Sequence, residues 1–227
     1  MKLPKETEVH GRWYGDACGT AFGLELIGER WALLVVRELM FGARRFSDLR
    51  ASLPGISAKV LTERLGALER HGVLTRRKLA PPGAAQVYEL TEWGYRAEPL
   101  IQEIGRWAAM SAQHDPTLPL SPASLMLSMR TMLARSEAAA FEGTVGFDIA
   151  GDQFVARLSE GELAIRRGLP DDADAKITAP AAASIAAMLY AAADPAVLES
   201  EAGLSISGKR LLALRFAKLF RLPDKLA

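Results

Sequence analysis

The sequence predicts an α+β protein of two domains, and three observations carry that prediction. Over residues 44–78, two short helical patterns separated by a Pro-Gly stop lead into a basic hairpin pattern. Over residues 145–177, apolar and polar residues alternate as they do in half-buried strands. Between these regions, the segment 114–122 carries three prolines in nine residues, which removes backbone donors and blocks helix formation. We therefore expect domains at 1–115 and 123–227.

The bulk properties exclude several classes of protein. No apolar run reaches the ~18 residues of a membrane span, and the first residues lack the apolar core of a signal peptide. The single cysteine, Cys18, excludes an internal disulfide framework and fits a reducing compartment. One cysteine and three scattered histidines offer no metal-ligand spacing. We expect a cytoplasmic protein without a metal or another cofactor.

The N-terminal half begins with helical patterns. Apolar residues at helical spacing predict helices over 17–27 and 30–41, which meet near Gly28. A shorter helix is expected over 46–53, where Pro54-Gly55 supplies a stop signal. Together these segments form the first part of a helix-turn-helix pattern.

The next helix carries the clearest local signals in the chain. Ser57 is the expected N-cap, because its hydroxyl can accept a bond from the first turn. Leu61, Leu65 and Leu68 form one apolar stripe at i, i+4 and i+7. The opposite face is polar and small near its beginning, as a helix that enters a major groove requires. Gly72 is expected to end the helix as its C′ residue.

A hairpin and a longer helix complete this half. Residues 73–78 and 86–90 flank the loop LAPPGAA, and their composition predicts two strands of a wing. A last helix is expected from Thr91. Three large apolar residues share one face of it: Leu100, Ile104 and Trp107. Such a stripe belongs to a core more often than to an interface, but this small domain leaves little core to fill, so we favour an interface with a second subunit.

Positive charge collects in the same region. Residues 44–78 hold nine Lys or Arg against three Asp or Glu, although the whole chain has a net charge of only +1. Lys and Arg displace condensed counterions from duplex DNA. A basic face can also be merely solvated. Because the order of elements, the capping and the charge agree, we favour DNA binding by a winged helix-turn-helix.

The motifs in this half resemble the HxlR family of bacterial winged-helix regulators over about residues 17–110. They are a cysteine, IGERW, FGARRFSDL, and PGIS followed by L-x-x-RL-x-x-LE-x-x-G. The resemblance implies a homodimer built through terminal helices, with two recognition helices on a pseudo-palindromic double-stranded operator. By motif position, the DNA-facing residues on the helices are Arg44, Arg45, Ser47, Ser57, Lys59, Thr62 and Arg64. In the wing, the corresponding residues are Arg76, Arg77 and Lys78, which we expect beside the DNA backbone or minor groove.

Cys18 falls where several members of that family carry a redox-sensing thiol. A thiol near a helix N-terminus has a lowered pKa and is more nucleophilic, whereas the nearby Asp16 acts in the opposite direction. With no other cysteine in the chain, an oxidised form must be a disulfide to Cys18 of the partner subunit or a mixed disulfide. We favour the alternative that Cys18 is a small packed residue.

The C-terminal half predicts a sheet with helices over one face. We expect a helix over 123–142, then half-buried strands within 145–177, separated by turns. A helix over 180–192, a short strand at 204–206 and a closing amphipathic helix over 209–220 follow. This unit is an α+β domain.

Its motifs resemble the sterol-carrier-protein fold over about residues 123–222. They are V-x-F-x-I-x-G-D-x-F, E-G-E-L-x-I, D-A-x-I-T-A and L-x-I-S-G-K. The resemblance implies an apolar tunnel between sheet and helices, although each candidate lining residue is individually more typical of plain core. The candidate ligand-binding residues are Phe141, Phe147, Phe154, Ile165, Ile177, Met188 and Phe216.

These inferences converge on a homodimeric transcriptional regulator whose operator binding is modulated by a hydrophobic small molecule in the C-terminal domain. Two alternatives stay open. In one, the C-terminal domain is purely structural, and sensing lies at Cys18. In the other, the chain is a lipid carrier whose winged helix binds another protein. An enzyme is not expected, because the sequence shows no nucleophile–base pair and no phosphate loop.

Overall fold

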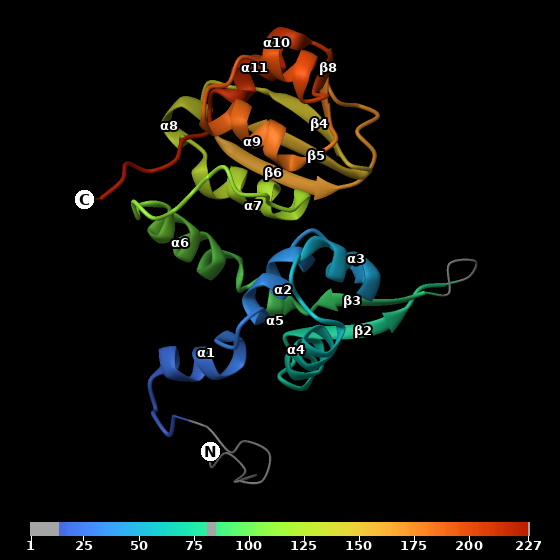
Figure 1. The fold of residues 1–227 in the computed structure, drawn as a ribbon, viewed down its shortest axis with the longest axis vertical. Coiled ribbons are helices and arrows are strands. Elements are labelled where there is room, and N and C mark those ends of the chain that lie inside the picture. The colour runs from blue at the N-terminus through green and yellow to red at the C-terminus, as the bar shows by residue number, and fades with distance from the viewer. Residues whose placement is uncertain (1–13, 81–84, 227) are drawn as a thin grey trace.

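The computed structural model describes residues 14–80 and 85–226, and it shows the expected mixture of helices and strands (Figure 1). The expected absence of a signal peptide rests on residues 1–19, and residues 1–13 of that stretch lie outside the described residues. Residues 81–84 of the predicted hairpin loop 79–85 also lie outside them.

The N-terminal half confirms the helix-turn-helix and the hairpin. Among the described residues, its strands form a three-stranded antiparallel sheet in the order β1-β3-β2. The elements are α1 (Gly19–Ile27), α2 (Ala32–Leu39), β1 (Arg44–Arg45), α3 (Phe46–Ser52), α4 (Ala58–Arg70), β2 (Leu74–Lys78), β3 (Gln86–Leu90), α5 (Glu92–Tyr95) and α6 (Glu98–Ala109).

Two helices of this half differ from the sequence prediction. The helix α2 begins later than expected, because Trp31 at its N-cap has a left-handed φ of 78°. The single helix expected from Thr91 is two helices, α5 and α6. Pro99 explains the break, since it has no N–H and its ring would clash with the carbonyl of Tyr95 in a continuous helix. Thr91 is nevertheless the N-cap of α5, where its hydroxyl accepts from the amide of Gly94 at 3.0 Å.

The C-terminal half contains, within the described residues, a five-stranded sheet in the order β6-β5-β4-β7-β8. Strands β4 and β7 are parallel, and the other neighbours are antiparallel. The helices α7, α9 and α11 contact its strands. The elements are α7 (Pro122–Met132), α8 (Arg135–Ala138), β4 (Gly143–Ile149), β5 (Asp152–Ser159), β6 (Glu162–Arg167), β7 (Ala175–Ala179), α9 (Ala182–Tyr190), α10 (Pro195–Glu201), β8 (Ser205–Gly208) and α11 (Arg210–Ala217).

Two features of this half were not predicted. The helix expected over 123–142 ends at Met132, because Leu133 adopts an extended conformation and forms an isolated bridge with Phe220. The helix α10 was missed, although its start signal is in the sequence. Asp194 caps it by accepting from the amide of Ala196 at 2.9 Å, and a proline occupies its first turn.

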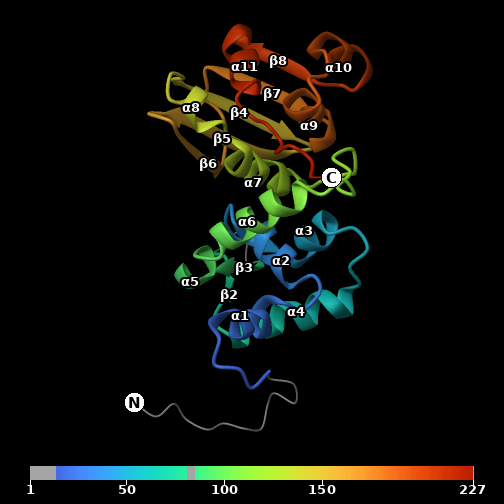
Figure 2. The same ribbon diagram turned by 90° about the vertical axis from the view of Figure 1, so that its left-hand side faces the viewer.

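The two halves pack against each other. Figure 2 shows α6 and α7 lying between the two sheets. The ring of Phe41 meets that of Phe154 edge to face, with centroids 5.6 Å apart, which is a favourable aromatic geometry. The start of the proline segment is also held in place by Lys225. Its ammonium donates to three backbone carbonyls at 3.0 Å each, those of Ala109, Ser111 and His114. The junction between the two halves is therefore a packed part of the fold.

Candidate DNA-binding surface

The helix α4 is positioned as its local sequence predicts. The hydroxyl of Ser57 accepts from the amide of Val60 at 3.2 Å, which satisfies one of the free donors of the first turn. Leu61, Leu65 and Leu68 are buried. Gly72 follows the helix with a φ of 72°, a left-handed conformation that glycine adopts without steric cost. The capped start of α4 therefore presents its polar face to solvent.

Three predicted residues lie on that exposed part of α4. Ser57, Lys59 and Thr62 are all exposed. Lys59 and Thr62 are three residues apart and so share one face of the helix. The hydroxyl of Thr62 donates to the carbonyl of Ala58 at 2.9 Å, which leaves its oxygen able to accept. This face offers a cation, a hydroxyl and little bulk, which suits the edges of bases in a major groove.

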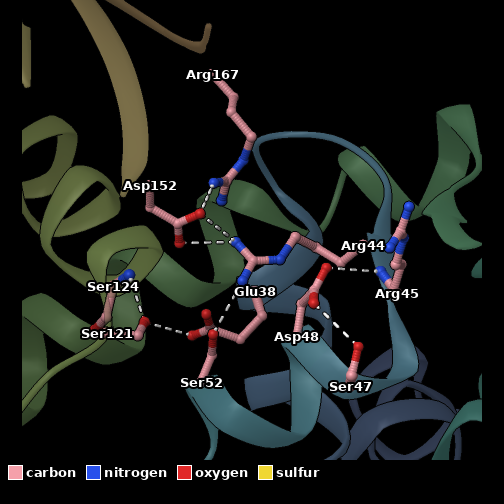
Figure 3. A network of polar contacts seen from close by, with 10 residues as sticks. All are labelled: Glu38, Arg44, Arg45, Ser47, Asp48, Ser52, Ser121, Ser124, Asp152 and Arg167. Atoms are coloured by element: carbon pink, nitrogen blue, oxygen red, sulfur yellow. Dashed lines mark hydrogen bonds and ion pairs between the residues drawn. The ribbon is translucent and has the colours of Figure 1, made fainter. Parts of the chain in front are cut away.

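Two more predicted residues stand at the start of α3. Arg45 and Ser47 are exposed, and Asp48 orders this turn. Its carboxylate accepts from the amide of Arg45 at 3.4 Å and from the hydroxyl of Ser47 at 3.1 Å (Figure 3). The guanidinium of Arg45 points away from the rest of the polar cluster in that view. It is thus placed to meet a phosphate.

The wing carries the remaining predicted cations. Arg76, Arg77 and Lys78 are exposed on β2. Glu89 accepts from Nε of Arg77 at 2.5 Å, and Nε of Arg76 lies 3.7 Å from a carboxylate oxygen of Glu69. Exposed ion pairs of this kind contribute only about 0–1 kcal/mol. A phosphate can therefore replace either acid at small cost.

Arg44, which was predicted to face DNA, is directed at the junction between the two halves. It is 9% exposed. Its Nη1 lies 3.0 Å from Oδ2 of Asp152 in the C-terminal half, and its Nη2 donates to Ser52 at 3.2 Å. The reason is strand geometry, since successive side chains of a strand point to opposite faces. Figure 3 shows Arg44 directed at Asp152 and its neighbour Arg45 directed elsewhere. In this arrangement the guanidinium of Arg44 is held at the junction of the two halves and is little exposed to solvent.

Arg64, which was also predicted to face DNA, has partners within the N-terminal half. Its Nε donates to the carbonyl of Arg30 at 3.1 Å, and its Nη2 pairs with Glu29 at 3.2 Å. The side chain is half-buried. It ties α4 to the turn that precedes α2.

Asp152 joins two arginines at the junction. Besides Arg44, it accepts from Nη1 of Arg167 at 2.5 Å. The guanidinium of Arg167 also lies over the ring of Phe154, 4.5 Å from its centroid. Burial, followed by the charge of Arg44, lowers the pKa of Arg167. Two partly desolvated cations therefore share one carboxylate, and each depends on it.

Glu38 forms the second part of this cluster. It is 1% exposed on α2. Its Oε1 accepts from Nη2 of Arg37 at 2.8 Å. The same oxygen accepts from the hydroxyl of Ser121 at 2.7 Å (Figure 3). Ser121 also caps α7, because its hydroxyl accepts from the amide of Ser124 at 3.0 Å. The acid thus attaches α2 to the first turn of the C-terminal half. Its position among apolar neighbours on α2 was the sequence signal for a buried acid.

The predicted tunnel residues lie in a packed core. Phe147, Phe154, Ile177 and Phe216 are fully buried, and the other three are nearly so. The ring centroid of Phe216 is 5.6 Å from that of Phe141 and 6.3 Å from that of Phe147. These are contact distances between rings. Side chains therefore fill the space that a tunnel between these rings would need.

Cys18 is exposed, which corrects the expectation of a packed residue. It stands at the N-cap of α1. Hydrogen bonds from the backbone of Ala21 and Thr20 lower the pKa of the thiol, as expected for this position. The carboxylate of Asp16 accepts from the Cys18 amide at 2.9 Å. The structure thus presents an accessible thiol whose pKa is lowered.

Two other findings concern residues 14–80 and 85–226. No group of three or more His, Cys, Asp or Glu among them is arranged to hold a metal ion. No helix in these ranges is both long and apolar enough to cross a membrane.

Comparison with known proteins places relatives on the N-terminal half. The family model for the HxlR-like helix-turn-helix matches residues 26–116. The uncharacterized HTH-type transcriptional regulator YvaP of Bacillus subtilis (strain 168) is 38% identical over 85 residues, 37% of this chain and 79% of that protein. The HTH-type transcriptional regulator YodB of the same strain is 37% identical over 93 residues, 41% of this chain and 83% of that protein.

A solved structure, the reduced form of YodB from B. subtilis, is 32% identical to this chain with a TM-score of 0.40. The match covers 44% of this chain and 100% of the YodB chain. The family model ends at residue 116, before the five-stranded sheet begins.

Proposed function

The chain belongs to the HxlR family of helix-turn-helix transcriptional regulators, and on that premise we propose that it binds operator DNA as a homodimer through α4 and the β2–β3 wing. The observation that carries this proposal is the exposed polar face at the capped start of α4, beside a basic wing. Ser57, Lys59 and Thr62 would contact bases. The remaining exposed cations would bind phosphates, which adds affinity without sequence information.

Exposed apolar side chains support the homodimer. On α6, Leu100, Ile104 and Trp107 are 53%, 51% and 76% exposed, and on α1, Phe22 and Leu24 are also exposed. Large apolar side chains gathered on the surface mark association sites. A second copy covering α1 and α6 would place two α4 helices on successive half-sites.

We further propose that a hydrophobic small molecule modulates DNA binding through the C-terminal half. The contacts of Asp152 with Arg44 and of Ser121 with Glu38 support this, because they join that half directly to α2 and to the start of α3. A ligand changes DNA binding only if it favours one arrangement of the two halves over another. In the second candidate, sensing lies at Cys18. Its exposure and lowered pKa favour that candidate.

The test of operator binding is a matched pair of lysine variants. A duplex selected from a random library would be titrated by fluorescence anisotropy at several salt concentrations. We expect Lys59→Ala to weaken binding and relax sequence preference, because each lost phosphate or base contact costs affinity. Lys218→Ala removes the same charge from an exposed position near the end of α11 and should change nothing. Equal affinity for all three proteins would overturn the proposed DNA-binding surface.

Sedimentation of Trp107→Glu would test the dimer, because a charge at the centre of an apolar interface opposes association. A dimer that persists in this variant would exclude the α6 face.

A further inference from the structure

A cavity of about 440 Å³ lies at the junction between the two halves. Its walls come from α2, α6, the proline segment, α7 and α9. One lining residue from each of these five segments, in the same order, is Leu34, Ile101, Leu120, Leu127 and Tyr190. Its volume falls in the range of about 300–1,000 Å³ that is typical of small-molecule sites, and such sites are common between domains. It is distinct from the rings around Phe216.

The lining is mostly apolar, with one neutral polar feature. The hydroxyls of Ser128 and Tyr190 are 2.7 Å apart and share one hydrogen bond. Each hydroxyl has one donor and can accept twice, so this bond leaves the pair with one donor and further acceptor capacity. Burial raises the pKa of Tyr190, which keeps the phenol neutral.

The charged and titratable side chains around the cavity already have partners within the protein. Arg37 borders it, but its Nε and Nη2 both bind the carboxylate of Glu38. Asp115 accepts from both the amide and the hydroxyl of Thr117. His114 lies beside the ammonium of Lys225. Each of these charged groups already has a partner of its own, and a neutral ligand need not compete for any of them.

We propose that this junction cavity binds a neutral, largely apolar small molecule that carries one hydroxyl or carbonyl oxygen, which bonds to the Ser128–Tyr190 pair. The molecule would touch α2 and α6 on one side and α7 and α9 on the other. Binding would therefore favour the arrangement in which the two halves are packed together. Its effect on the operator complex rests on the proposed function, but the cavity itself does not.

Two matched probes test the cavity in the full-length chain. 2-Naphthol carries one hydroxyl, and naphthalene is the same ring system without it. By equilibrium dialysis we expect saturable binding of both, with 2-naphthol roughly fivefold tighter because of one additional hydrogen bond. In the double variant Ser128→Ala/Tyr190→Phe, which removes both hydroxyls of the pair, 2-naphthol should fall to the affinity of naphthalene, while naphthalene binding stays unchanged. An equal loss for both probes would overturn the role of the hydroxyl pair.

Gly105 allows the cavity to be blocked. It lines the cavity, and a Cβ added there meets nothing within 4 Å. Gly105→Phe should therefore fold and bind neither probe. Gly19→Phe is the matched control, because Gly19 has the same free space at the start of α1, and it should bind both. Circular dichroism checks the fold of each variant. The proposal fails if wild type binds neither probe saturably, or if folded Gly105→Phe still binds them.

Operator affinity measured with and without 2-naphthol separates the two proposals. Saturable binding without a change in operator affinity would refute modulation and leave the cavity inference intact. A protein that binds 2-naphthol but no duplex DNA would refute the proposed function alone.

Discussion

The exposed surface around α4 and the buried junction between the two halves use the same residue types in opposite ways. On the surface, Arg76 and Arg77 hold acids loosely, and solvent or a phosphate can take the place of those acids. At the junction, Arg44 and Arg167 lie largely out of water and share Asp152. Removing one member of such a buried group leaves an uncompensated charge. Burial therefore decides whether an arginine is available to a ligand or is needed by the fold.

Asp152→Ala should have the largest effect on stability. It leaves the guanidinium groups of Arg44 and Arg167 without their carboxylate, and losing one partner of a buried pair costs about 3–5 kcal/mol. We expect the lower end of that range, because the Asp152 side chain is 28% exposed. Urea unfolding measures the change. Asp171→Ala, at an exposed position, should stay within about 0.5 kcal/mol of wild type. Equal stability of the two variants would show that the junction pairs are dispensable.

Arg45→Ala and Arg44→Ala sharpen the comparison at neighbouring positions. Arg45→Ala should weaken operator binding and reduce the slope of log affinity against log salt by about 1, with little change in stability. Arg44→Ala should lower stability by about 1.5–3 kcal/mol, the contribution of hydrogen bonds to a charged group, because it leaves Asp152 with one partner fewer. Fluorescence anisotropy measures operator binding by both variants, and urea unfolding measures their stability. A larger loss of the salt slope in Arg44→Ala would contradict the assignment.

Ser121→Ala should have a smaller effect at the same junction. It removes the cap of α7 and one bond to Glu38, and loss of a cap costs about 1 kcal/mol. Ser121→Asp keeps a cap but brings a second carboxylate to Glu38, so it should be no more stable than Ser121→Ala. Thermal unfolding of both variants checks this. If Ser121→Asp restored wild-type stability, the contact with Glu38 would be unimportant.

The pH dependence of Cys18 should show the smallest effect. The hydrogen bonds from Ala21 and Thr20 lower its pKa in the folded chain. The folded thiol should therefore react with iodoacetamide at half its maximal rate at a lower pH than the urea-unfolded chain does. A depressed pKa adds stability above the unfolded pKa, and that contribution is lost as the pH falls through the folded value. Identical reaction profiles for the folded and unfolded chains would show that these hydrogen bonds have no effect on the pKa of the thiol.

Sequence patterns were sufficient to predict those features of the fold that depend on residues close together in the chain. Ser57, the leucine stripe of α4 and Gly72 each act within a few residues, and all are confirmed. The two strands of the wing are also confirmed. Two errors arose from local signals that were available but not applied, namely Pro99 in the first turn of α6 and the Asp194 cap of α10.

The junction is different in kind. Arg44 and Asp152 are 108 positions apart, and Glu38 and Ser121 are 83 positions apart. No periodicity or capping rule connects residues at such separations, because the contacts exist only after the two sheets have packed around α6 and α7. The chain's local patterns therefore specify a helix that can read DNA, with its cap, its stripe and its basic wing. Long-range packing determines which of two adjacent arginines is exposed to solvent, and where a cavity remains beside the closed core of the second half.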